Sequence, residues 1–415
     1  DSPPMTASAA PSLTPPPFSL KPLMFQTFAC TMAMMAFTTL AGPVGSALQL
    51  ASWQMGLAVA AGGVAWMVAA HPWGKASDRR GRRPILLLGL GGFALCYAGL
   101  CLSASLALRG LLSPLAALAA FIVWRGLAGA CYAAVPVVGN ALIADHTPHE
   151  QRAGALAALG VASGASMTIG PALAALLADR SLEAPLYAMA FLPAIAFIAL
   201  WFFLPKDGAR PPAPGEPSSQ SQSNAPLSDP RLRRPAVAAF LCMACVAAAQ
   251  IIVGFYAIDR LGMTPQESAR VAGLALASVG VALIAAQGAV RRFKWPPERL
   301  VVVGPAVASA GFLLGGFADA TALLYAGYFV AAIGMGLAWP AISALAANAV
   351  DRHEQGAAAG AVSAAQGMGA IVGPTAGAAI YGLAPSAPYV LAAALLAGLA
   401  LWITPAGNGP VKKIK

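Results

Sequence analysis

The sequence predicts an all-α membrane protein with twelve spanning helices. Hydrophobic residues make up 59% of the 415-residue chain and charged residues only 10%, whereas a soluble domain averages about 25% charged residues. The apolar residues form twelve segments, and a helix needs about 20 such residues to cross hydrocarbon. The segments lie near residues 22–45, 53–72, 84–106, 114–142, 153–178, 185–204, 235–257, 267–290, 300–318, 321–346, 357–382 and 386–404.

The distribution of Lys and Arg predicts the orientation of these segments. The stretch 71–84, between the second and third segments, holds five Lys and Arg residues, and short cytoplasmic loops collect such residues. An even number of spans returns the chain to its starting side, so we expect both termini in the cytoplasm. About 20 of the 25 Lys and Arg residues then share that side. The net charge of +10 therefore reflects orientation, and no nucleic-acid partner is expected.

The chain divides into two halves between two tails. Residues 1–21 lack the pattern of a signal peptide and predict a disordered cytoplasmic tail, and residues 405–415 form a basic cytoplasmic tail. The Pro- and Ser-rich stretch 205–234 predicts a flexible cytoplasmic linker. Pro136 and His149-Glu150-Gln151 recur at Pro340 and His353-Glu354-Gln355 with one offset of 204 residues. The halves 22–204 and 235–404 are thus repeats, and transporters with such repeats bind substrate between them near the bilayer midplane.

The basic stretch also carries a family resemblance. The pattern Gly74-x-x-x-Asp78-Arg79-x-Gly81-Arg82-Arg83 resembles the signature loop of the major facilitator superfamily, in the version found in tetracycline and multidrug exporters of the drug:proton antiporter branch. The resemblance implies two pseudo-symmetric six-helix bundles and a multi-pass protein of the bacterial inner membrane. It also implies alternating-access export of a small amphiphilic compound by proton antiport. We expect a monomer without a cofactor.

The resemblance assigns a conformational latch to this loop. It implies that Asp78 lies near the start of the eleventh segment, where a helix N-terminus favours a carboxylate. It also implies that Arg82 pairs with an acid at the end of segment four, where Asp145 stands. The simpler interpretation is a positive anchor with local ion pairs. The corresponding stretch 291–299 lacks the Gly and Asp pattern, so the latch is expected on one side only.

Arg125 is the charged residue that lies deepest in an apolar segment. Such a residue costs several kcal/mol unless it is paired or hydrated, so it predicts a function; the alternative is that it extends to the outer interface. The string Arg125-Gly126-x-x-Gly129 is similar to the family's segment-four motif, whose Arg is implicated in proton coupling. Asp259, near the outer end of segment seven, is the second coupling candidate.

Two glycine-proline patterns stand in corresponding segments. Gly170-Pro171 in segment five is a degraded copy of the family's antiporter motif, and Gly369-x-x-x-Gly373-Pro374-x-x-Gly377 in segment eleven is a better one. Small residues let helices approach closely in lipid. We weigh simple helix packing equally with a role in sealing the exporter against leak.

The middle of the segments holds no Asp or Glu. A cationic drug would find no buried counter-charge, so the pattern favours a neutral or anionic, partly apolar ligand. Each polar or aromatic residue there is singly more typical of helix packing, but together they predict a cavity. The candidates are Thr31, Met34, Met35, Thr38, Asn140, Gln250, Tyr256, Trp339 and Gln366.

Other function classes find little support. The four His residues lack paired metal spacing, and no Ser-His-Asp arrangement or phosphate loop is present, so neither a metal site nor an enzyme is expected. Within the transporter class, a dedicated exporter of an endogenous metabolite such as a siderophore, or an organic-anion uptake transporter, remains open. A non-transporting membrane sensor on the same fold is a further alternative.

Overall fold

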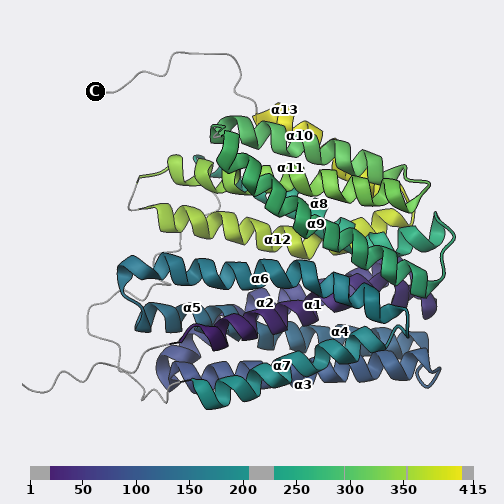
Figure 1. Ribbon diagram of the computed structural model, residues 1–415, viewed down its shortest axis with the longest axis horizontal. Coiled ribbons are helices and arrows are strands. Elements are labelled where there is room, and N and C mark those ends of the chain that lie inside the picture. Colours follow the sequence, from purple (N-terminus) through teal and green to yellow (C-terminus); the bar gives the residue numbers. More distant parts are fainter. Residues whose placement is uncertain (1–18, 205–228, 294, 352–353, 404–415) are drawn as a thin grey trace, which may run out of the picture.

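The computed structural model describes residues 19–204, 229–293, 295–351 and 354–403, which form thirteen α-helices (Figure 1). The first half contains α1 (Lys21–Ala47), α2 (Ser52–Arg80), α3 (Arg82–Leu108), α4 (Pro114–Tyr132), α5 (Ala134–His146), α6 (His149–Ala178) and α7 (Ala184–Phe203). The second contains α8 (Arg233–Asp259), α9 (Pro265–Phe293), α10 (Pro297–Gly316), α11 (Thr321–Asn348), α12 (Gln355–Tyr381) and α13 (Ala387–Ile403). The predicted tail and linker residues 1–18, 205–228 and 404–415 lie outside this description.

The all-α fold class is confirmed, and α4 and α5 together occupy the fourth predicted segment. Among the described helices, ten are long and apolar enough to cross a membrane when Pro114–His146 is taken as one span. The apolar α13 is shorter, and α12 is not among the ten. Ala and Gly dominate α12. This composition suits its place between α2 and α8, because small residues allow close helix contact within a membrane.

Pro136 explains why the fourth span is broken. The predicted segment 114–142 is interrupted at Ala133 and continues as α5 to His146. A proline inside a helix donates no hydrogen bond, and its ring clashes with the carbonyl four residues earlier. For Pro136 that carbonyl belongs to Tyr132, the last residue of α4.

The basic stretch is helical, which corrects the predicted loop between segments two and three. α2 continues through Lys75 and Asp78 to Arg80, and α3 begins at Arg82. Only Gly81 interrupts the two helices. Its φ of 93° is a conformation that side chains disfavour and glycine adopts freely.

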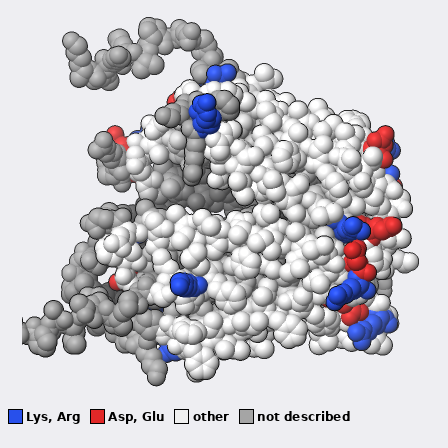
Figure 2. Space-filling model, viewed as in Figure 1, with Lys and Arg blue, Asp and Glu red and all other residues white. Residues whose placement is uncertain are grey.

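The two halves lie side by side, with α1–α7 in the lower part of Figure 1 and α8–α13 in the upper part. Three helices of the first half, α1, α2 and α6, contact α8, α9 and α12 of the second. The helix ends divide into two groups. At the basic end Lys and Arg outnumber the acids Asp78, Asp145, Asp229, Glu298, Asp351 and Glu354; the cations there include Lys75, Arg79, Arg80, Arg82, Arg83, Arg152, Arg231, Arg233, Arg234 and Arg299. At the mixed-charge end lie Arg109, Asp179, Arg180, Glu183, Asp259, Arg260, Glu267, Arg270 and Asp319. Basic and acidic side chains gather together at the right edge of Figure 2.

The halves touch closely near the mixed-charge end. A Cβ at Gly56 of α2 would lie 2.5 Å from the Pro374 carbonyl oxygen of α12, and one at Gly273 of α9 would lie 2.4 Å from that of Pro171 in α6. The Ser52 hydroxyl donates to the Ala378 carbonyl across the same interface at 2.8 Å. At Gly56 and Gly273 the helix backbones approach so closely that a side chain would clash with the facing carbonyl.

The same helices separate toward the basic end. A Cβ added at Gly160 or Gly164 of α6, at Gly288 of α9, or at Gly367 of α12 would meet nothing within 4 Å. The space-filling view is hollowed between the two halves on the left, where the basic end lies, and closed on the right (Figure 2). The molecule therefore has a cleft between its halves that opens at the basic end.

Candidate functional site

Arg125 on α4 is a buried charged residue within the first half. Its residue is 4% exposed, so the side chain does not extend to the surface. One guanidinium nitrogen, Nη1, contacts the Met34 sulfur of α1. The guanidinium carbon lies 5.4 Å from the centre of the Phe37 ring, and Nε has no hydrogen-bond partner. The partners of this cation are thus a thioether and an aromatic face.

Two glycines make room for Arg125. A Cβ at Gly129 of α4 would lie 2.1 Å from the Gly62 carbonyl oxygen of α2, so these backbones touch. A Cβ at Gly62 would lie 3.3 Å from Cγ of Arg125. Arg125 and Gly129 belong to the segment-four motif that the sequence identified, and the structure shows that this glycine brings α2 against the arginine.

The first half holds further buried polar groups, and Gln26 among them lies beside Gly139 of α5. The Thr31 hydroxyl lies 3.0 Å from the Tyr132 hydroxyl. The Tyr97 hydroxyl of α3 and both amide atoms of Gln26 in α1 have no hydrogen-bond partner. Sequence analysis missed Gln26, Tyr97 and Tyr132. Their signal was a polar group within an apolar segment, the criterion that selected the other candidates.

The remaining cavity candidates occupy different environments. Met34 and Met35 are half-buried on α1, and the Thr38 hydroxyl donates to the Met34 carbonyl at 3.1 Å. Three half-buried candidates lie on the second half: Gln250 on α8, Trp339 on α11 and Gln366 on α12. Asn140, on α5, is exposed.

Tyr256 differs from the prediction because it lies in the interior of the second half. It is fully buried, and its hydroxyl donates to the carbonyls of Gly316 and Ala318 at 3.0 and 2.9 Å. Its ring packs edge-on against Tyr389. Such a tyrosine joins α8 to α10 and α13 and does not line the cleft.

Asp259 lies at the mixed-charge end of α8. Its residue is exposed, and its Oδ2 accepts a hydrogen bond from the Tyr381 hydroxyl of α12 at 2.8 Å. This pair lies within the second half. The two coupling candidates, Arg125 and Asp259, are therefore not brought together.

The basic stretch forms a polar cluster within the first half. Arg82 contacts the Asp78 carboxylate, and its Nε donates to Asp145 of α5 at 3.0 Å, so the pair that the resemblance implies is formed. Arg82 also donates to the Ser77 hydroxyl, which donates to the Gly74 carbonyl. Arg79 is exposed, and Arg83 donates to the Trp201 carbonyl of α7.

The predicted glycine-proline patterns serve two kinds of contact. Gly170 faces Met32 of α1, and Gly369, Gly373 and Gly377 face Phe240, Ala244 and Ala248 of α8. These glycines pack helices within each half. The carbonyls of Pro171 and Pro374 instead face glycines of the opposite half, as described above.

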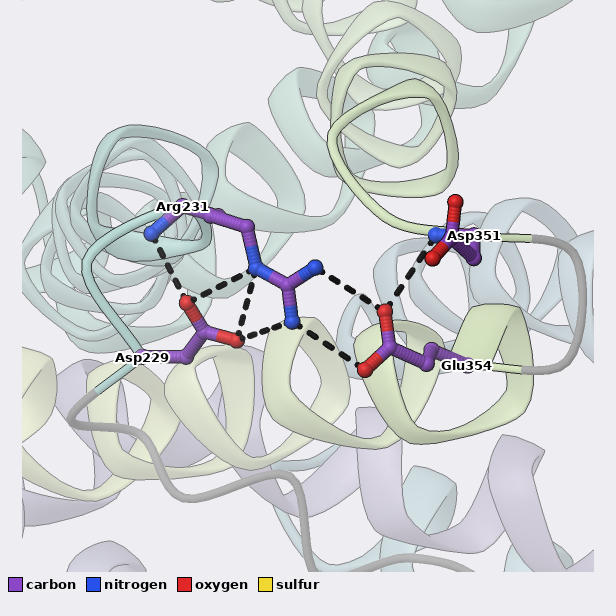
Figure 3. A network of polar contacts seen from close by, with 4 residues as sticks. All are labelled: Asp229, Arg231, Asp351 and Glu354. Carbon is purple, nitrogen blue, oxygen red and sulfur yellow. Dashed lines mark hydrogen bonds and ion pairs between the residues drawn. The ribbon is translucent and has the colours of Figure 1, made fainter.

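A second polar cluster lies at the basic end of the second half (Figure 3). Arg231 donates to Asp229 at 2.9 Å and to Glu354 at 3.0 Å, and Glu354 accepts from the Asp351 backbone at 3.3 Å. The Arg231 guanidinium holds the pKa of Asp229 below its ordinary value. The cluster joins the start of α8 to the turn between α11 and α12. Among the described residues, no group of three or more His, Cys, Asp or Glu could hold a metal ion.

Comparison with known proteins identifies the type of molecule. The model of the Major Facilitator Superfamily matches residues 23–374 and 268–415. The chain is 29% identical to the class C tetracycline resistance protein of Escherichia coli over 80% of each chain. It is 27% identical to the class G protein of Vibrio anguillarum, over 74% of this chain and 75% of that one.

Solved structures share the fold. The human organic anion transporter MFSD10 is 21% identical, with a TM-score of 0.61 over 94% of this chain and all of that one. The nucleoside transporter NupG is 14% identical, with a TM-score of 0.68 over 93% of this chain and 98% of that one.

Proposed function

The chain belongs to the Major Facilitator Superfamily, and on that premise we propose that this secondary transporter exports a small amphiphilic compound by proton antiport. The observation that carries the proposal is the cleft between the halves, closed near the mixed-charge end and open at the basic end. In alternating access, two repeats rock about a site at their interface. This structure would be the state that loads substrate from the basic end.

The direction of export depends on which end is cytoplasmic. Cytoplasmic loops of membrane proteins carry an excess of Lys and Arg. We therefore assign the basic end, both termini and the linker to the cytoplasm of a bacterial inner membrane. The cleft then opens to the cytoplasm, as loading in an exporter requires. The similarity to tetracycline resistance proteins supports the same direction.

The residues along the cleft favour a neutral or anionic substrate. Methionine and hydroxyl side chains from α1 and the half-buried Gln250, Trp339 and Gln366 offer apolar contact with few hydrogen bonds. For proton coupling we propose Arg125, because it is the buried charged residue of the described spans. Asp259 is the second candidate, at the mixed-charge end.

The basic stretch would act when the cleft closes. In this open state Asp78 pairs with Arg82 of its own half. We propose that closure brings Asp78 against the start of α12, where the helix dipole favours a carboxylate. Gly74, Arg79, Gly81, Arg83 and Asp145 would shape and anchor this latch. The Gly56–Pro374 and Gly273–Pro171 contacts would open at the other end.

Transport into inverted vesicles tests this function. The full chain would be assayed in inverted and right-side-out vesicles under an imposed pH gradient, with a panel of drugs and metal chelators. Substrate-dependent proton movement and accumulation only in inverted vesicles would support export. Response to a single chelator-like compound would favour a dedicated metabolite exporter such as one for siderophores. Accumulation in right-side-out vesicles would favour organic-anion uptake, and no movement in either would contradict the proposal.

A further inference from the structure

The buried charge of the first half has no counter-charge. Arg125 is the single buried charged residue among those that the structure describes, and no described ion pair includes it. Taking a guanidinium out of water is costly unless another charge compensates. The contacts with Met34 and Phe37 compensate only in part, because a sulfur is a weak acceptor and a ring face carries no net charge.

Tyr97 and Tyr132 lie close enough to Arg125 to interact with its charge, and these groups keep unused hydrogen-bonding capacity. Its own Nε and the Tyr97 hydroxyl lack partners. In the pair formed by Thr31 and Tyr132, one hydroxyl donates to the other, so the accepting hydroxyl keeps its proton available. Buried polar groups in native proteins are nearly always paired. A cation and two hydroxyl donors with spare capacity can together donate hydrogen bonds to an electron-rich ligand.

Met34 of α1 covers one side of the Arg125 guanidinium. It is half-buried on α1, whereas Arg125 behind it is buried, and its sulfur touches the guanidinium. Methionine is unbranched and changes rotamer readily. A rotation of this side chain would expose the guanidinium to the cleft without movement of a helix.

We propose that Arg125, Tyr97, Tyr132 and Thr31 form a subsite for the anionic group of a monoanionic, partly apolar substrate, with Met34 as its movable cover. This inference rests on the proposed transport function and narrows its substrate class. A carboxylate or similar planar oxyanion suits the site, because the guanidinium fork binds two oxygens in one plane. The apolar body of the ligand would lie in the cleft against the methionines.

A matched pair of probes tests the subsite. The purified full chain would be titrated with 2-naphthoate and with the neutral 2-naphthamide at neutral pH. We expect the acid to bind at least about tenfold more tightly, because a hydrogen bond to a charged group is stronger than one to a neutral group. Arg125→Gln should abolish the preference, Arg125→Lys should keep part of it, and Tyr132→Phe should weaken the acid alone. Arg109→Gln, at the mixed-charge end, is the control and should leave the preference unchanged.

Equal binding of acid and amide by the native chain would overturn the proposal, as would an acid preference that survives in Arg125→Gln. If that variant does not fold, modification of Arg125 by phenylglyoxal, mapped by mass spectrometry, replaces it. Protection by naphthoate but not by naphthamide is then expected, and equal protection by both would reject the subsite. The titration measures binding and not transport. Failure of the vesicle assay would therefore contradict the proposed function without deciding whether the anion subsite exists.

Discussion

The two halves share one fold but differ in whether their buried polar groups have hydrogen-bond partners. In the second half, the hydroxyls of Tyr256, Tyr328 and Tyr389 all make hydrogen bonds. In the first, buried atoms of Gln26, Trp66, Arg83, Tyr97 and Arg125 have no partner among the described residues. Unsatisfied buried groups destabilise a fold. The difference suggests that the second half is the more rigid scaffold, while the first carries chemistry reserved for a ligand.

The largest expected effect comes from Arg125→Met. Transport should fall to below a tenth, because the charge that recognises substrate or couples protons is gone. Stability should rise, because an uncompensated buried charge is strongly destabilising and an apolar side chain of similar length removes it. Vesicle transport and thermal unfolding in detergent would measure both. A less stable variant with intact transport would contradict the contrast between the halves.

Gly273→Ala should shift the balance between the open and closed states. Its new Cβ would lie 2.4 Å from the Pro171 carbonyl oxygen and 2.6 Å from Cβ of Ala175, so the contact between the halves must open. Labelling of Ser52→Cys by a membrane-impermeant maleimide should rise several-fold in a background without other cysteines. Gly398→Ala is the control, since nothing lies within 4 Å of its Cβ. Unchanged labelling would show that this contact does not hold the halves together.

Asp78→Asn should reduce transport several-fold while the protein remains folded. The pair between Arg82 and Asp145 stays in place, so the loss would come from closure at the basic end. Asp229→Asn, in the basic cluster of the second half, should change transport less than twofold. Native turnover in Asp78→Asn, measured in proteoliposomes, would remove the latch from the mechanism.

Tyr256→Phe should affect stability alone. Two buried carbonyls would lose their donor, which costs about 1–3 kcal/mol. Transport at a temperature below unfolding should stay native, because the hydroxyl does not face the cleft. A transport defect in a stable variant would show that the Tyr256 hydroxyl acts in the substrate cavity.

The smallest effect concerns Glu183 at the mixed-charge end. Hydrogen bonds from Arg109 and Ser105 hold the pKa of Glu183 below its ordinary value. A lowered carboxylate pKa stabilises the folded state at neutral pH, and this contribution disappears as the pH falls through the shifted pKa. Glu183→Gln should therefore unfold at a slightly lower temperature than the native protein at pH 7. The two melting temperatures should converge at acidic pH, below the ordinary range of the carboxyl.

Sequence patterns predicted the helices better than their contacts. Hydropathy located the spans, but two boundaries differed from the prediction, at Pro136 and at Gly81. Each residue acts through local backbone geometry, which hydropathy averaged over many residues does not show. The Arg82–Asp145 pair followed from motif positions. Tyr256 and Gln26 could not be placed, because the direction of a polar side chain depends on helix rotation and on partners from distant segments.

The break between α4 and α5 divides the fourth span into two helices that can differ in direction. The outer helix, α4, is held in place, because Gly129 contacts the backbone of Gly62 and the Arg125 side chain is buried. The inner helix, α5, carries Asp145 near its end, and this residue forms an ion pair with Arg82 at the start of α3. A change of backbone dihedral angles at Ala133 would therefore redirect α5 without disturbing the surroundings of Arg125. One span thus carries the proposed substrate contact on α4 and the proposed latch contact on α5.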